Sequence, residues 1–237
     1  MRPIGFSTGA LTLSDFRHAI NILQDKAVSA IEISALRFRE LDPMLELLSE
    51  CDLAKYKFKG VHAPSSFDER DEAYIVKQLQ RYVPGDWPIV LHPDAIYDFS
   101  LWSSFGDQLA IENMDRRKPI GRTAAELSII FNELPDASLC FDIGHARQVD
   151  TTMTEAYNIL KKHGRRLTWL HVSEVNSQSR HEPLSFAAIN AFSEISYLIP
   201  DDVPVILEAR TSAEAIDMEL HNAQRALPKH LSSLKSA

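Results

Sequence analysis

Cysteine is scarce in this chain, which has only Cys51 and Cys140 among its 237 residues. Two thiols cannot form the multi-bridge framework of a small secreted domain, so we expect both to be reduced in a cytoplasmic protein. Long hydrophobic runs are also missing. No stretch approaches the roughly 20 apolar residues that cross a bilayer, and the opening MRPIGFSTGAL has no apolar segment of signal-peptide length. We therefore expect neither a secretion signal nor a membrane partner.

Basic residues are outnumbered, with 25 Lys and Arg against 33 Asp and Glu and a formal net charge of -8. Binding to a nucleic-acid backbone depends on Lys and Arg that neutralise phosphates, so this balance argues against nucleic acid as the main partner. At 45% hydrophobic and 24% charged, the composition is that of an ordinary globular protein. It specifies no particular oligomeric state.

The chain repeats one unit, in which a short apolar run is followed by a polar loop and a helix-like amphipathic segment. The runs recur at intervals of roughly thirty residues, the length of a strand with its crossover helix. We predict strands at residues 4–7, 30–34, 58–62, 88–92, 109–113, 139–143, 167–172 and 204–208. Eight strands that alternate with helices favour a closed parallel (β/α)8 barrel, a TIM barrel, as a single domain over residues 1–237.

Helix signals lie between these runs. Ser14 is expected to cap a helix that begins at Asp15, and Thr123 has capping-box spacing to Glu126. Helical periodicity also marks residues 44–53, 153–162 and 213–227. Only residues 94–106 are left for a helix between the fourth and fifth strands, so this crossover is the weakest part of the predicted barrel.

Period-two alternation is an independent test of the barrel. If the last residue of a strand points inward, the residue two positions before it must do so as well. In most strands that residue is small or apolar, as a packed interior requires: Gly60, Val90, Ala110, Cys140 and Ile206. Trp169 is the bulky exception.

Residues with affinity for metal ions follow six of the predicted strands, at the end where barrel enzymes place their active sites. They are His62 in GVHAP, His92 in IVLHP, Glu112 in LAIEN, Asp142 and His145 in CFDIGH, His171 in WLHVSE, His181 in SRHEPL and Glu208 in VILEAR. Any one of them alone is more simply a hydrogen-bonded structural residue or a helix cap. When all of them lie at one rim, the buried carboxylates among them need a counter-charge, which a bound metal ion would supply. Imidazole and carboxylate ligands suit zinc, manganese, iron or cobalt, and we expect one to three such ions per chain.

Further polar residues are expected around this rim. Glu32 ends the second strand and should point inward, where it would orient a metal ligand or a loop arginine of the substrate-binding region; a buried salt bridge is the alternative. Arg180 and Arg210 are placed to bind substrate at the mouth. A wider basic rim would consist of Arg37, Arg39, Arg116, Arg117 and Lys118, unless these side chains are simply solvated.

Taken together, HAP, LHP, ENxD, FDIGH, HVSE and LEAR resemble the xylose isomerase-like barrel superfamily. This superfamily includes endonuclease IV (AP endonuclease family 2) and many sugar isomerases and epimerases. The resemblance covers the whole chain in register. It implies a shared metal site at Glu112, Asp142, His171 and Glu208, whose two glutamates also carry the proton in the epimerases.

The endonuclease IV branch adds ligands for a second and a third zinc ion, which correspond to His62, His92, His145 and His181. This chain departs from that branch at two positions. Ser179 stands where the branch has an Asp, which removes a charged ligand from the third metal site. Ser65 replaces the aromatic residue that follows HAP in the DNA-repair enzymes, which argues against abasic-site DNA as the substrate.

Three functions are compatible with these residues. The preferred one is phosphate-ester hydrolysis of a small or sugar-like substrate at a two- or three-metal site, with ions roughly 3.5–4 Å apart that activate a water. His62 and His92 favour it, because a one-metal isomerase has no evident need for them. The alternative is a single-metal isomerase or epimerase of a sugar or keto-sugar, with Glu112 and Glu208 as its acid–base pair. The third, a binding barrel without catalysis, is disfavoured by the presence of both glutamates.

Overall fold

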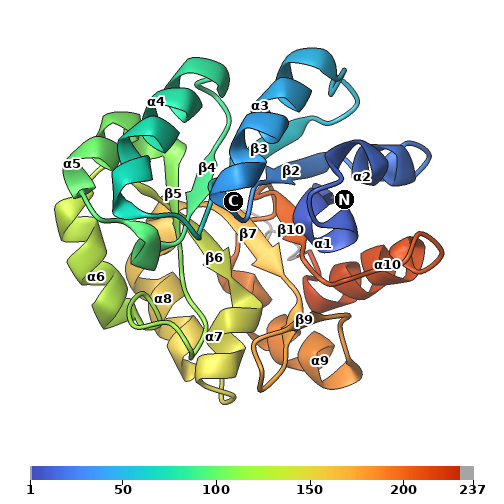
Figure 1. Cartoon of the computed structure of the whole chain (residues 1–237). Coiled ribbons are helices and arrows are strands. Elements are labelled where there is room, and N and C mark those ends of the chain that lie inside the picture. Colours follow the sequence, from blue (N-terminus) through green and yellow to red (C-terminus); the bar gives the residue numbers. More distant parts are fainter. Residues whose placement is uncertain (1, 230–237) are drawn as a thin grey trace, which may run out of the picture.

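The computed structural model describes residues 2–229, so residue 1 and residues 230–237 of the predicted domain lie outside it. Eight parallel strands form its centre: β1 (Ile4–Ser7), β2 (Ala30–Ser34), β3 (Phe58–His62), β4 (Ile89–Leu91), β5 (Leu109–Glu112), β6 (Ser138–Asp142), β7 (Leu167–Val172) and β10 (Val205–Leu207). They close into a barrel in the order β1-β10-β7-β6-β5-β4-β3-β2 (Figure 1). The predicted (β/α)8 barrel is confirmed, and every predicted strand agrees with its observed bounds to within one residue.

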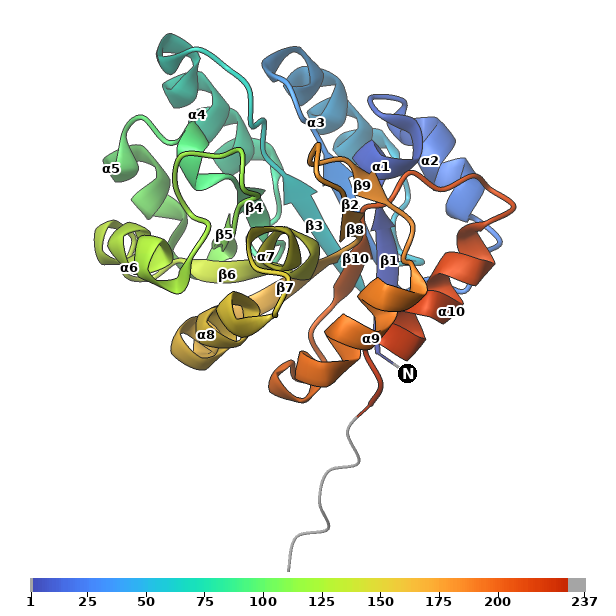
Figure 2. The ribbon, with the colours of Figure 1, turned by 90° about the horizontal axis from the view of Figure 1, so that it is seen from below.

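Helices connect the strands and surround the barrel (Figures 1 and 2). They are α1 (Thr8–Thr12), α2 (Phe16–Leu23), α3 (Leu41–Glu50), α4 (Glu72–Tyr82), α5 (Phe99–Trp102), α6 (Ala124–Glu133), α7 (Ile143–Val149), α8 (Thr154–His163), α9 (Phe186–Ile195) and α10 (Ile216–Ala226). The weak crossover between β4 and β5 is short, as expected: α5 and two 3-10 segments, residues 93–95 and 103–108, replace a full helix. None of the helices within residues 2–229 is both long enough and apolar enough to cross a membrane.

Two helix starts show how local side chains begin these crossovers. Thr123 caps α6 as predicted, because its hydroxyl accepts a hydrogen bond from the Glu126 backbone N–H at 3.2 Å. The prediction that Ser14 caps the next helix is wrong. The cap of α2 is Asp15, whose carboxylate accepts a hydrogen bond from the backbone N–H of His18 at 3.1 Å. A carboxylate at this position also interacts favourably with the helix dipole.

The barrel interior is a small apolar cluster separate from the main core, which lies between strands and helices. It consists of Ala30, Val90, Ala110, Cys140, Trp169 and Ile206. The prediction from period-two alternation is therefore confirmed. Trp169 fits because β3 contributes Gly60, where an added Cβ would lie only 2.9 Å from the indole Cζ2.

A polar layer lies directly above this cluster, at the carboxyl ends of the strands. Strand alternation places in it the residues two positions after each interior residue. They are Ser7, Glu32, His62, His92, Glu112, Asp142, His171 and Glu208. Apart from His92 and Glu208, which are partly exposed, all of them are buried. The barrel thus buries a concentration of ionisable side chains at one end.

Candidate metal centre

Four of these side chains converge from four strands that are consecutive around the barrel. Glu112, Asp142, His171 and Glu208 come from β5, β6, β7 and the end of β10, and each offers a ligand atom within 4.8 Å of the others. His171 Nδ1 lies 3.4 Å from Glu112 Oε1 and 3.4 Å from Glu208 Oε2. We call these four residues the central group. They are the residues that the superfamily resemblance assigns to a shared ion.

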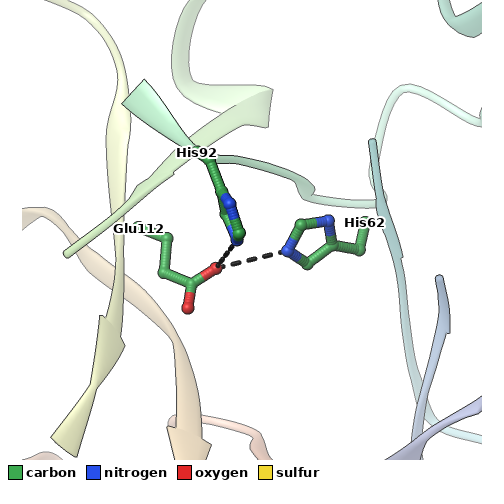
Figure 3. A group of neighbouring side chains, drawn as sticks. All are labelled: His62, His92 and Glu112. Atoms are coloured by element: carbon green, nitrogen blue, oxygen red, sulfur yellow. Dashed lines mark hydrogen bonds and ion pairs between the residues drawn. The ribbon is translucent and has the colours of Figure 1, made fainter. Parts of the chain in front are cut away.

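A second group shares one carboxylate with the central group. In Figure 3, His62 and His92 both point at Glu112, and the Nε2 atom of each lies 3.2 Å from Glu112 Oε2. His62 Nδ1 is 2.8 Å from the carbonyl oxygen of Ala63. A proton on Nδ1 would be donated to that carbonyl, which leaves Nε2 free to bind a cation beside Glu112.

A third group consists of Asp142, His145 and His181. Asp142 caps α7, since its Oδ1 accepts a hydrogen bond from the His145 backbone N–H at 2.7 Å, and this places His145 in the first turn of the helix. His181 lies on a two-stranded hairpin, β8 (Glu174–Val175) and β9 (His181–Glu182), and its ring centroid is 5.2 Å from that of His145. The hydroxyl of Ser179 donates a hydrogen bond to Asp115 and accepts one from Gln148 Nε2, each at 2.7 Å, so its partners lie outside this group.

Two supporting residues were not identified from the sequence. Asn113 fixes Asp142 through both backbone atoms: its Nδ2 donates to the Asp142 carbonyl and its Oδ1 accepts from the Asp142 N–H, each at 2.8 Å. Ser173 Oγ lies 2.9 Å from His181 Nδ1. Asn113 directly follows the candidate ligand Glu112 in ENxD, and Ser173 comes two residues after His171 in HVSE. Their closeness in sequence to a candidate ligand is the feature that could have indicated a supporting role.

The two glutamates of the central group differ in their electrostatic environment. Burial alone would raise the pKa of Glu112, but the positive charges of His171 and His92 hold it well below its usual range. Burial raises the pKa of Glu208 to about 8 despite the opposing effect of His171, and the negative charge of Glu112 contributes to this. Without a cation, one carboxylate is therefore ionised and the other protonated at neutral pH.

The central group has the chemistry of a divalent-cation site. Asp142 Oδ2 and His171 Nδ1 are buried without a hydrogen-bond partner, and each such atom costs about 1–3 kcal/mol. A cation between them would satisfy both atoms and offset the charge of three carboxylates. Three carboxylates and one imidazole suit zinc, manganese, iron or cobalt. The residues present therefore fit a divalent metal ion.

Zinc affinity is expected to fall as the pH is lowered from 8 to 6. Ligation requires ionised carboxylate and neutral imidazole, whereas the pKa of Glu208 is about 8 and that of His145, raised by Asp142 and Glu112 against the effect of burial, is about 10. Below pH 8 both side chains are mostly protonated, and zinc must displace a proton from each one that it binds. For each proton displaced, zinc binding weakens about tenfold per unit of pH. Calorimetry in buffers of different ionisation enthalpy counts the released protons. An affinity that stays constant from pH 8 to pH 6 would contradict this account.

A pocket of about 710 Å³ opens beside the central group and includes Glu208 and His181 in its wall. Its lining includes the apolar side chains of Leu13 and Leu36, the acid Glu182 and the two predicted substrate-binding arginines, Arg180 and Arg210. Neither arginine forms an ion pair within residues 2–229. A separate pocket of about 370 Å³ at the opposite end of the barrel includes none of the candidate ligands.

The wider basic rim is largely neutralised by neighbouring acids. The observed ion pairs are Arg37 with Glu40 at 2.8 Å, Arg117 with Asp115 at 3.3 Å and Lys118 with Asp94 at 2.7 Å. Glu32 is fully buried beneath the site, 2.8 Å from His171 Nε2, and is not part of the pocket wall. Arg39 and Arg116 form no ion pair within residues 2–229. Among the residues that line the pocket, Arg180 and Arg210 carry the positive charge, and Glu182 and Glu208 are the acids.

No protein-family model matches this sequence, and no curated protein matches it either. Solved structures match it along nearly its whole length. The zinc-bound IolI protein has a TM-score of 0.64 at 14% identity, covering 98% of this chain and 100% of its own. The 3-keto-D-glucoside 4-epimerase YcjR from E. coli, in its apo form, has a TM-score of 0.57 at 12% identity, covering 93% of this chain and 98% of its own.

A protein from Anabaena variabilis, provisionally assigned as a sugar phosphate isomerase/epimerase, has a TM-score of 0.56 at 13% identity and covers 100% of this chain and 92% of its own. At such identities these likenesses establish the fold. They agree with the barrel superfamily indicated by the strand-end motifs.

Proposed function

We propose that this protein is a divalent-metal-dependent isomerase or epimerase of a small sugar or keto-sugar that carries an anionic group. The observation that carries the proposal is the central group, in which two glutamates in different electrostatic environments flank one candidate ion position. The presence of a sugar epimerase and a zinc-binding protein among barrels of the same fold supports it. This function replaces phosphate-ester hydrolysis, the function that the sequence favoured, as the first candidate.

The residues have distinct tasks in such a reaction. Glu112, Asp142, His171 and Glu208 would hold the ion, and the bound ion would supply a Lewis acid for a substrate carbonyl and the neighbouring hydroxyl. Glu112 and Glu208 project from strands three positions apart around the barrel, so they approach a bound substrate from different sides. One accepts a proton from the carbon beside the carbonyl and the other donates a proton. Because ligation requires both carboxylates to be ionised, the glutamate that donates must first take up a proton, from the substrate hydroxyl or from solvent.

The pocket indicates where the anionic group of the substrate lies. Arg180 and Arg210 line the same pocket as Glu208 and have no acidic partner within residues 2–229. Guanidinium groups pair with carboxylate or phosphate through parallel hydrogen bonds. A substrate whose carbonyl end lies at the central group would therefore place its carboxylate or phosphate against these arginines.

Proton exchange in D₂O tests this function directly. With zinc or manganese added, we expect deuterium to enter the carbon beside the carbonyl of an anionic ketose, drawn from a panel of ketoses with and without phosphate or carboxylate. Glu208→Gln should slow the exchange by about 10²–10⁴-fold, the usual contribution of a general acid or base. Exchange in no member of the panel, or exchange at the parent rate in E208Q, would refute the proposal.

Removing the positive charge of the pocket tests whether the substrate carries an anionic group. The double variant Arg180→Met with Arg210→Met should raise KM for the anionic ketose at least about tenfold and leave kcat nearly unchanged, because the arginines bind ground state and transition state alike. The KM of a neutral ketose should not change. Equal effects on both substrates would show that the arginines act on the fold and not on the anionic group.

Phosphate-ester hydrolysis remains the second candidate because two further ligand groups adjoin the central one. His92→Ala separates the two functions, since it removes a ligand of the second group and leaves the central group intact. For the proposed isomerase we expect one bound ion per chain and a loss of turnover of no more than about 10–100-fold in H92A, the size of an outer-shell change. Two or three ions, with phosphomonoester hydrolysis that H92A abolishes, would establish the hydrolase instead. Elemental analysis and a phosphate-release assay give both readouts.

A further inference from the structure

The carboxylate of Glu32 is fully buried at the end of β2 and accepts hydrogen bonds on both oxygens. Oε2 lies 2.8 Å from Trp169 Nε1 and 2.8 Å from His171 Nε2, and Oε1 accepts from Ser34 Oγ at 3.1 Å. No Lys or Arg forms an ion pair with Glu32 within residues 2–229. Its ion pair within these residues is with His171, and the charge of His62 also acts on it.

These partners fix where the hydrogen of His171 lies. An indole N–H can only donate, and the Ser34 hydroxyl donates as well, so both oxygens of Glu32 act as acceptors. The Nε2 atom of His171 must therefore carry the hydrogen that bridges it to Glu32. In the neutral ring this leaves the lone pair on Nδ1, the buried atom that faces Glu112 and Glu208 and has no hydrogen-bond partner.

We propose that Glu32 is the positioning residue of the metal centre: it holds His171 so that Nδ1, and not Nε2, binds the ion. This inference rests on the metal dependence in the proposed function and deepens it. A carboxylate that fixes the outer nitrogen of a ligating imidazole sets both its tautomer and its ring orientation. Glu32 itself is too deeply buried to touch substrate.

The neighbouring residues hold Glu32 in turn. Ser34 Oγ is 2.7 Å from Ser7 Oγ, and since Ser34 donates its own hydrogen to Glu32, Ser7 is the donor to Ser34. Ser7 lies in the wall of the substrate pocket. An unbroken hydrogen-bonded chain therefore runs from the pocket through Ser7, Ser34 and Glu32 to His171. If Glu32 served only as a structural link between β2 and β7, its hydrogen bonds to Trp169 and His171 would be enough, and neither serine would be needed.

Zinc affinity of the variant Glu32→Gln, measured by chelator competition, is the first test. The amide keeps the volume of the side chain but has one acceptor oxygen and an NH2 donor in place of two acceptor oxygens, so we expect zinc to bind about 10–100-fold more weakly. A loss smaller than about twofold would overturn the proposal. If E32Q does not fold, Ser34→Ala removes the hydrogen bond to Oε1 and the one from Ser7, but leaves the Glu32 carboxylate in contact with Trp169 and His171. We then expect a loss on the order of fivefold, less than the full cost of a hydrogen bond to a charged group. Unchanged affinity in S34A would count against the proposal in the same way.

Glu72 offers a matched control. Its buried carboxylate also accepts an indole hydrogen bond, from Trp102 Nε1 at 2.8 Å, together with the backbone N–H groups of Tyr97 and Asp98, but it contacts no candidate ligand. Glu72→Gln should therefore leave zinc affinity unchanged. A loss equal to that of E32Q would show that any buried glutamate has this effect and would overturn the positioning role.

NMR of the unmodified protein loaded with cadmium-113 shows which ring nitrogen of His171 binds the ion. We expect coupling from cadmium to His171 Nδ1, with the hydrogen retained on Nε2. Coupling to Nε2 would overturn this inference while the metal-dependent function stands. Coupling to Nδ1 in a protein that exchanges no sugar proton would support the role of Glu32 and refute the isomerase. A chain that binds neither zinc nor cadmium would overturn both.

Discussion

Glu112→Gln is expected to eliminate zinc binding and turnover together. Glu112 belongs to both the central group and the group with His62 and His92, and its two oxygens lie within 3.4 Å of four imidazoles. An amide removes the charge that balances the ion in both groups, so the affinity loss should exceed the roughly 100-fold cost of changing an outer-shell residue. Turnover should fall by on the order of 10³-fold or more, because the same side chain is half of the acid–base pair.

Glu219→Gln is the control for this variant. Glu219 is a buried glutamate of α10 that accepts a hydrogen bond from the Leu184 N–H at 3.0 Å, and burial raises its pKa. It contacts no candidate ligand, so zinc affinity and turnover should stay at the parent level. If E112Q bound zinc as tightly as the parent, the assignment of both ligand groups would be wrong.

Gly5→Ala should destabilise the barrel more than other single changes of one methyl group. Gly5 pairs with Ala30 where β1 meets β2, and an added Cβ would lie 1.7 Å from the Ala30 carbonyl oxygen. That oxygen belongs to backbone held in the sheet, so relief requires the two strands to separate. We expect a loss of roughly 3 kcal/mol or more in the free energy of unfolding, and a melting temperature lower by on the order of 10 °C.

Gly164→Ala provides the comparison. Gly164 has helical backbone angles, φ −58° and ψ −21°, and no atom lies within 4 Å of the added Cβ. The same substitution should there be neutral or stabilise by about 0.4–1 kcal/mol through the unfolded chain. Both variants are to be unfolded with a chelator present, so that bound metal does not contribute. A G5A protein as stable as G164A would mean that β1 and β2 do not pair in this register.

The barrel and its metal-ligand candidates could be predicted because both follow from strand periodicity. Once a strand is known to end at His62 or Glu112, alternation places that side chain inside the barrel mouth, and closure brings the strand ends together. The bulk of Trp169 did not fit the predicted alternation of small and apolar interior residues, and the structure explains it by placing Gly60 beside the indole ring. Sequence alone does not show which interior residues lie next to each other.

The partners in the supporting contacts could not be predicted, since they join residues that are far apart in the chain. Glu32 was expected to orient a metal ligand or a loop arginine, but the sequence did not show that its partner is His171. Asn113 holds Asp142 across 29 positions, and Glu32 reaches His171 across 139. The ion pairs that neutralise Arg117 and Lys118 depend on loop conformations without periodicity. Choosing between hydrolysis and isomerisation was harder still, because the same ligand residues serve both reactions. The first preference therefore changed when the fold could be compared with known barrels.

Barrel closure also affects the order in which this protein can mature. The strand that follows β7 around the barrel is β10, which pairs with β1, so the sheet cannot close until the segment that ends in Glu208 has been synthesised. Until then the histidines of β3, β4 and β7 stand on an open sheet, and the central group lacks its fourth member. The central group can therefore be completed only in the finished barrel. A chain interrupted before β10 should emerge from the ribosome without its central group, and should gain that ion position only when the last strand is added.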